Sequence, residues 1–392
     1  MTDWTARAVA WHTRHRFLLS FATLSLFMGI SVGLAKVTTS LYALQLGAQG
    51  WWLGAIAAAQ SVGILLTALP MGLWVERFGP RRLFMLGSLA GGALYAVLPL
   101  IPSAAFLLGM TVLTGIVMPS RFVSLQTIFM TMLHQIGSAN AGWQRAAHMS
   151  GMFLLGPLLT ASVVAHLGHA GSYWLVALMF VLTVGLSQPV LRHPLPGLSP
   201  RTGAQGGLVI AMAQLLAHRE ARNLAAAEAC VQALNMYHAF FIVVIAVQEL
   251  GIPATVAGSL VAVQGASFIA ALLLLGPAVQ RLGARAAAAG AALASLGCMT
   301  LGLGDATVAL LAGSACLGLG IGLIEIGVIG RMAVLGTQLG QSRMAGLNAV
   351  AGPGGALLGG LAGGSLGNWL GLQPVYLLFV PVLWLVMSRR TT

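Results

Sequence analysis

Charged residues are what this sequence most conspicuously lacks. Only 7% of its 392 residues are charged, while 58% are hydrophobic, and a soluble globular domain carries about 25% charged residues. A soluble fold of this size would need a polar surface that this composition cannot supply. The composition therefore excludes an ordinary soluble protein and predicts an all-α polytopic membrane protein.

Cysteine and the usual motifs of catalysis are also scarce. Cys230, Cys298 and Cys316 all lie inside apolar runs, where a free cysteine is most often a small buried apolar side chain. The sequence has no HExxH or CxxC motif, no clustered ligand set and no phosphate-binding loop. We therefore expect no disulfide, no metal, no cofactor, no nucleotide hydrolysis and no enzymatic activity.

Long apolar runs recur along the whole chain, and each could cross a bilayer core of about 30 Å as a helix. Breaks at glycine, proline and charge clusters divide them into twelve expected spans. A segment rich in proline and arginine falls midway. It predicts two pseudo-twofold-related six-helix bundles, 1–191 and 222–392, joined by a cytoplasmic linker over 192–221. The expected spans are 17–46, 51–75, 82–101, 104–131, 145–167, 172–191, 222–249, 254–278, 285–303, 306–330, 344–367 and 372–388.

The basic residues indicate how the chain is oriented. With the N-terminus inside, 17 of the 19 lysines and arginines lie on the cytoplasmic side, and the outer loops contain none. Such asymmetry follows the positive-inside rule. The arginines would face an anionic inner leaflet, so the net charge of +12 requires no nucleic-acid partner. We expect a monomer in the cytoplasmic (inner) membrane of a bacterium, with both termini cytoplasmic.

An internal repeat appears at an offset of 204 residues. GLWVERFGPR, from Gly72 to Arg81, aligns with GPAVQRLGAR, from Gly276 to Arg285. Two Gly-Pro pairs give a second echo in the fifth span of each half: Gly156-Pro157 and Gly352-Pro353. Two halves in parallel orientation are typical of transporters whose substrate site lies where the halves meet.

The first copy of this repeat resembles the loop signature of the major facilitator superfamily. That signature is G, three residues, D or E, R, one residue, G, one residue and two basic residues. Six positions match it: Gly72, Glu76, Arg77, Gly79, Arg81 and Arg82. The second copy has Gln280 at the acidic position. MFLLGPLLTAS (152–162) is similar to the fifth-helix motif of the superfamily's proton antiporters, with Leu159 and Thr160 replacing a pair of glycines.

The resemblance implies that the loop is a conformational lock or gate. In the superfamily the loop acid, here Glu76, contacts the end of the eleventh helix and stabilises the outward-facing state. The alternative is simple topology, in which the arginines hold the loop inside. That alternative explains Arg81 and Arg82 but not Glu76 or the glycine spacing.

Arg121 and Glu325 are charged residues inside the expected fourth and tenth spans, and their numbers also differ by 204. Charges within a membrane usually face a cavity and pair, because burying them alone is costly. We predict an Arg121–Glu325 salt bridge that closes the cytoplasmic side and weakens when Glu325 is protonated. The alternative is that each charge has a partner within its own half.

Candidates for binding substrate or protons lie in the first and seventh spans. Lys36 could bind an anionic group, or it could extend toward the outer interface. Asn235, Tyr237 and His238 could bind substrate or relay protons, or they could hydrogen-bond to other helices. Helix packing and hinges are the roles expected of small residues and prolines in the fifth and eleventh spans: Gly156, Pro157, Gly352, Pro353, Gly355 and Gly359.

These observations predict a secondary active transporter that works by alternating access. We expect proton-coupled export of a small amphipathic or weakly charged molecule, because few charges lie within the membrane. An uptake symporter on the same scaffold remains open. So does a membrane protein that does not pump, such as a sensor or a lipid-handling protein.

Overall fold

The computed structural model describes residues 2–136, 147–191, 215–339 and 341–388, and these residues form helices joined by short turns. Most of the expected linker, together with Arg145, lies outside the described residues. In chain order the elements are α1 (Thr2–Gln45), α2 (Trp51–Phe78), α3 (Pro80–Val97), η1 (Leu98–Leu100), α4 (Ala104–Ile136), η3 (Ser150–Leu155), α6 (Gly156–Leu191), α8 (Arg219–Val244), η4 (Ile245–Glu249), α9 (Ala254–Leu274), α10 (Gly276–Leu282), α11 (Ala284–Leu303), α12 (Thr307–Leu339), α13 (Gln341–Leu370) and α14 (Val375–Ser388).

Nine stretches of the described chain are long and apolar enough to cross a membrane. The protein is therefore a multi-pass integral membrane protein. The expected number of twelve is not reached by this criterion, for three reasons. The fifth and sixth expected spans are merged into one stretch, α13 is not among the nine, and α14 is only 14 residues long.

The merged stretch runs from Ala147 to Leu191, and it contains a sharp turn. Its 45 residues would extend about 65 Å as one straight helix, which is twice the thickness of a bilayer core. Gly168 interrupts it with φ 68° and ψ −178°, a conformation that is open to glycine because it lacks Cβ. The chain reverses here, at the boundary expected between the fifth and sixth spans.

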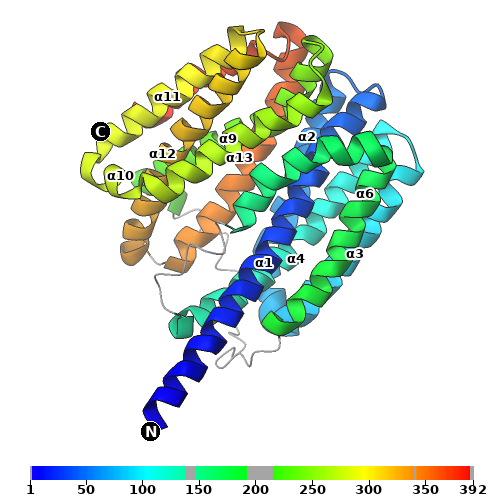
Figure 1. Ribbon diagram of the computed structural model, residues 1–392. Coiled ribbons are helices and arrows are strands. Elements are labelled where there is room, and N and C mark those ends of the chain that lie inside the picture. The colour runs from blue at the N-terminus through cyan, green and yellow to red at the C-terminus, as the bar shows by residue number, and fades with distance from the viewer. Residues whose placement is uncertain (1, 137–146, 192–214, 340, 389–392) are drawn as a thin grey trace.

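The helices before and after the segment 192–214 pack mainly among themselves. We call them the N-terminal helices (α1 to α6) and the C-terminal helices (α8 to α14). Among the N-terminal helices α1 packs on α6, α2 on α4, and α3 on both α4 and α6; among the others α11 packs on α12, α13 on α8, and α12 on α9. Figure 1 shows α1 crossing the middle of the molecule, with α3, α4 and α6 on one side and α9 to α12 on the other. The N-terminal part of α1 protrudes, so this helix begins well before the expected residue 17.

Both copies of the loop repeat carry a glycine with positive φ between two helices. Gly79 links α2 to α3 with φ 83°, and Gly283 links α10 to α11 with φ 52°. In each case the glycine immediately precedes the next helix. A positive φ strains residues with a Cβ, so the conformation explains why both copies of the loop carry glycine here.

The N-terminal and C-terminal helices approach most closely where α2 begins and α13 ends. A Cβ added to Gly54 would lie 2.3 Å from Cα of Gly364, and one added to Gly360 would lie 2.7 Å from the amide nitrogen of Ala58. Residue numbers fall along α13 as they rise along α2, so the helices are antiparallel. We call this contact the α2–α13 seam.

The seam lies away from Arg77, which stands at the other end of α2. Toward that end, which we call the arginine side, α13 faces α8 instead: the nearest atoms to a Cβ on Gly352 belong to Gln232 and Glu228. A second close approach joins α9 to the segment around Pro157. There a Cβ on Gly258 would lie 2.7 Å from the Pro157 carbonyl oxygen, and one on Gly265 would lie 2.3 Å from Cβ of Phe153.

Close backbone packing at the α2–α13 seam predicts that a side chain introduced there destabilises the protein. Gly54→Ala places a methyl group against backbone, so we expect it to lower the free energy of unfolding by about 1–3 kcal/mol. Gly185→Ala on α6 is the matched control, because a Cβ there meets nothing within 4 Å and alanine favours the helix. Thermal unfolding of the purified protein, followed by tryptophan fluorescence, compares the two. Equal melting temperatures would show that the seam tolerates a side chain.

Candidate functional site

A cavity lies between the N-terminal and C-terminal helices. Its walls come from α1, α2, α3, α4 and η1 on one side and from α8 on the other. It offers ≈ 40 Å³ to water-sized molecules, room for a few waters because one needs about 10–15 Å³ on this measure. The lining residues are Ala35, Lys36, Thr39, Ile56, Ala57, Gln60, Tyr95, Leu98, Thr111, Thr114, Met236, Ala239 and Phe240.

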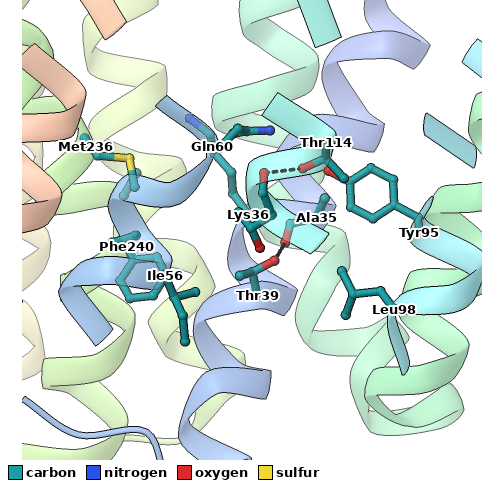
Figure 2. Close-up of a pocket in the computed structure, with 13 residues that line it drawn as sticks. Ala35, Lys36, Thr39, Ile56, Gln60, Tyr95, Leu98, Thr114, Met236 and Phe240 are labelled. Atoms are coloured by element: carbon teal, nitrogen blue, oxygen red, sulfur yellow. Dashed lines mark hydrogen bonds between the residues drawn. The ribbon is translucent and has the colours of Figure 1, made fainter. Parts of the chain in front are cut away.

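Lys36 is the one charged residue in this lining. It is half-buried, and Figure 2 places it with Gln60 between Met236 and Phe240 on one side and Tyr95 and Thr114 on the other. Lys36 therefore borders the cavity, and binding of an anionic group by it stays a prediction. Composition alone gave no reason to single out Gln60, Met236 or Phe240.

The predicted candidates on α8 do not line this cavity. Asn235, Tyr237 and His238 are all buried. Asn235 accepts a hydrogen bond from Gln264 at 2.8 Å, and Tyr237 donates to the carbonyl of Leu372. These side chains are therefore engaged among the C-terminal helices, which is the interhelical alternative that the sequence left open.

His238 belongs to the same buried network. Its Nδ1 lies 2.9 Å from the Tyr376 hydroxyl, and its Nε2 lies 3.4 Å from the Leu260 carbonyl oxygen. Met236, Ala239 and Phe240 face the cavity from the other side of α8. Met236, Ala239 and Phe240 share a face of α8, because residues three or four positions apart lie on the same side of a helix.

Arg121 lies on α4 and is completely buried. Its Nη2 donates to Thr183 Oγ1 at 2.9 Å, and its guanidinium carbon lies 3.7 Å from the centre of the Phe180 ring. Desolvated cation–π contacts contribute about 2 kcal/mol. Nε and Nη1 have no hydrogen-bond partner within the described chain. The contacts found for Arg121 thus hold it among the N-terminal helices.

The predicted partner of Arg121 is Glu325, which is buried on α12. Across the residues that the structure describes, no ion pair joins the two. The described ion pair that involves α12 joins Arg331 to Glu220 within the C-terminal helices. The Arg121–Glu325 bridge is therefore absent from this conformation and stays a prediction for another one.

Sequence reasoning missed a second buried carboxylate, Glu228 on α8, which is 3% exposed. Its Oε1 accepts a hydrogen bond from Gln232 at 3.0 Å. Its Oε2 and the Oδ1 of Asn348 on α13 have no hydrogen-bond partner among the described residues. The available signal was that Glu228 is an acid well inside an expected span.

The loop signature residues lie at the end of α2 and the start of α3. Arg81 donates to Gln188 of α6 at 3.3 Å, and Gly72 has open space around it. Arg77 and Arg82 are exposed. The side chain of Glu76 lies outside what the structure describes, and so does that of Arg343.

The two Gly-Pro pairs lie in different surroundings. Pro157 follows η3, a π-helical segment that ends at Leu155. Proline has no N–H to donate to the preceding turn, so the ladder of hydrogen bonds is broken there. Pro353 lies inside α13.

Two glycines that follow Pro353 on α13 pack closely on α8. A Cβ on Gly355 would lie 2.1 Å from the Ala229 carbonyl oxygen, and one on Gly359 would lie 2.1 Å from that of Ala233. Small residues allow such backbone contact between membrane helices.

Multiple apolar helices with a cavity between two sets of them are typical of membrane transporters, and comparison with known proteins gives the family. The Major Facilitator Superfamily profile matches residues 17–228, which is more than half of the chain. The chain belongs to this superfamily. It is a secondary transporter and not an enzyme.

Solved structures share the fold over nearly the whole chain. The crystal structure of nucleoside transporter NupG is 14% identical, has a TM-score of 0.78 and covers 96% of this chain and 98% of its own. A POT family transporter in complex with a thioalcohol-conjugated peptide is 12% identical, with a TM-score of 0.74 and 95% of each chain covered. Another POT structure, with 5-aminolevulinic acid, has a TM-score of 0.72 at 12% identity and covers 95% of each chain. A search of curated proteins found no significant match.

The hydrogen bond from Arg121 to Thr183 predicts that removing the Thr183 hydroxyl destabilises the protein. Thr183→Val keeps the shape of the side chain but removes the hydroxyl that accepts from Nη2. We expect unfolding to become easier by about 1–3 kcal/mol, since a buried donor loses its partner. Thr23→Val at an exposed position of α1 is the control. Thermal melts decide the question: an unchanged melting temperature for Thr183→Val would mean that this hydrogen bond adds no stability.

Proposed function

We propose that this protein exports a small molecule across the cytoplasmic membrane in exchange for protons. The observation that carries the proposal is the cavity whose walls come from both the N-terminal and the C-terminal helices. Because α8 forms one wall and α1, α2 and α4 form the other, moving one set against the other changes the size and access of the cavity. That movement is alternating access.

The arrangement that we propose is twelve spans in two six-helix bundles, 1–191 and 222–392, joined by a cytoplasmic linker over 192–221. The repeated turns at Gly79 and Gly283 and the reversal at Gly168 support it. The distribution of arginines supports cytoplasmic termini in the inner membrane of a bacterium. We propose that the transporter works as a monomer.

The contacts between the two sets of helices support a conformation that opens toward the arginine side. The α2–α13 seam is closed at the opposite side, where a Cβ on Gly50 would lie 2.9 Å from Asn368. The absence of an Arg121–Glu325 ion pair is consistent with it, since that bridge should form only when the arginine side closes. The signature loop, with Glu76 and Arg77, would stabilise the closed form of that side.

Proton coupling would use the buried carboxylates Glu325 and Glu228. An ionised carboxylate within the bilayer costs several kcal/mol unless it is paired, whereas its protonated form does not. Binding and release of a proton at either site would therefore shift the balance between conformations. The proton also offers a way to satisfy Glu228 Oε2, which could then donate.

The direction that we propose for transport is export. Export is favoured by the antiporter-like segment 152–162, whose π-helix and Pro157 form part of the contact with α9. Uptake on the same scaffold is the second candidate. The nucleoside and POT family transporters of similar fold support a small polar molecule or a peptide as the kind of substrate.

A two-step experiment tests the proposal. A thermal-shift screen of metabolites, metallophores and drugs on the purified protein first finds a ligand. Proteoliposomes with a pH dye inside then report proton flux when that ligand is added. Export coupled to protons predicts that ligand moving out of the cytoplasm-like compartment drives protons in. Ligand and protons moving together would support uptake by symport, and ligand binding with no flux would contradict pumping.

If the buried carboxylates carry protons, replacing them by amides should reduce proton flux. Glu325→Gln and Glu228→Gln keep the shape but cannot titrate. We expect Glu325→Gln to abolish ligand-driven proton flux while exchange of labelled for unlabelled ligand continues, and Glu228→Gln to reduce that flux. Glu249→Gln is the control, because Glu249 is exposed and its oxygen accepts from the Leu372 amide in either form. Wild-type proton flux in Glu325→Gln would remove that residue from the coupling.

A further inference from the structure

We propose that the cavity binds organic monocarboxylates, with Lys36 and Gln60 holding the carboxylate and the apolar wall holding the rest of the molecule. This inference deepens the proposed function, and it rests on that function only in treating the cavity as the substrate site. The charge of the lining favours an anion, because Lys36 is its one charged residue and no acidic residue lines the cavity.

The ammonium of Lys36 has no protein counter-charge. The described chain gives it no ion pair and no hydrogen bond. The buried carboxylates of Glu228 and Glu325 are not part of the lining. A cation in an apolar, half-buried place is costly unless an anion reaches it, so the site favours a ligand that brings a negative charge.

The hydrogen-bond donors of the lining point to the same class of ligand. The hydroxyls of the three lining threonines all donate to carbonyl oxygens of their own helices. Thr39 donates to Ala35 at 2.7 Å, Thr111 to Leu107 at 2.7 Å and Thr114 to Thr111 at 2.8 Å. Figure 2 shows two of these bonds. Thr39 also accepts from the Tyr173 hydroxyl. The donors that remain in the lining are the Lys36 ammonium, the Gln60 amide and the Tyr95 hydroxyl. Of these, Lys36 and Gln60 form a pair that suits two carboxylate oxygens.

The remaining walls limit the rest of the ligand. Ile56, Leu98, Met236 and Phe240 present apolar surface, which favours an alkyl or aryl group. A single cation balances one negative charge and leaves a second one uncompensated, so monocarboxylates should bind better than dicarboxylates or phosphates. The volume of ≈ 40 Å³ holds only waters, so such a ligand enters when α8 moves away from α1 and α2.

The sequence itself supplies a residue-specific probe, because Lys36 is the only lysine in the chain. Reductive methylation with formaldehyde and an amine–borane uses small uncharged reagents, and mass spectrometry of the peptide that contains Lys36 gives the rate. A synthetic peptide with one lysine in the same tube is the internal standard. The probes are benzoate, phenylacetate and 4-phenylbutyrate, each compared with its amide, and benzyltrimethylammonium as the cation.

We expect at least one carboxylate to slow methylation of Lys36 in the wild-type protein. At about ten times its dissociation constant a ligand leaves about one site in ten empty, so the rate should fall about tenfold. The amides and the quaternary ammonium should leave the rate unchanged. The proposal is overturned if no carboxylate slows the reaction, if amides protect as well as carboxylates, or if Lys36 does not react at all.

Variants give a second readout that does not depend on labelling. The protective carboxylate should raise the melting temperature of the wild-type protein and of Lys36→Arg, but not that of Lys36→Met, whose side chain has similar length without charge. The melting temperature of ligand-free Lys36→Met shows whether it folds. If that variant is unfolded, Gln60→Leu replaces it, and stabilisation of Gln60→Leu equal to wild type overturns the role of Gln60.

This experiment separates the inference from the proposed function. A carboxylate that protects Lys36 but drives no proton flux in proteoliposomes would contradict proton-coupled transport and leave the anion site intact. Proton flux driven by a ligand that does not protect Lys36 would support proton-coupled transport and contradict the anion site at Lys36.

Discussion

The structure depends on one constraint: inside a bilayer, a polar group that has no hydrogen-bond partner in the protein carries a large cost in free energy. Helices satisfy the hydrogen bonds of the backbone, which is why most of the described chain is helical. In the same way, many threonine hydroxyls donate to carbonyl oxygens of their own helices. The same constraint gives meaning to the few charges that remain. Arg121 is covered by an aromatic ring and a hydroxyl, Glu228 is held by a glutamine, and Lys36 borders a cavity.

Within lipid, hydrophobicity does not drive helices together, so close packing must do so. Glycines serve this purpose at several points where the described helices cross. Gly54 meets Gly364 between α2 and α13, and Gly355 meets Ala229 between α13 and α8. One contact joins the two sets of helices and the other lies within the C-terminal set. Backbone surfaces without side chains can part and meet again without repacking rotamers, which suits helices that must separate during transport.

The sequence predicted the helices well because long apolar runs, glycine turns and charge clusters act locally. The turns at Gly79 and Gly283 and the reversal at Gly168 all lie where the pattern placed them. Faces of helices were harder to predict. Lipid and protein interior are both apolar, so hydrophobicity does not say which side of a span faces the protein. On α8 the sequence left open whether Asn235, Tyr237 and His238 bind substrate or hydrogen-bond to other helices, and it gave no reason to expect the apolar Phe240 at the cavity. Long-range contacts also escaped prediction, as the Phe180 ring beneath Arg121 shows.

The crossing of α1 with η3 has a mechanical consequence. A Cβ on Gly33 would lie 2.3 Å from the Met152 carbonyl oxygen, so the two backbones are in direct contact with no side chain between them. The next residue, Phe153, abuts Gly265 of α9, while Lys36 stands one turn beyond Gly33. A stiff contact of this kind transmits displacement over a short path from α9 to the ammonium. Substitutions far from the cavity, at the face of α9, would therefore alter how tightly the cavity holds its contents.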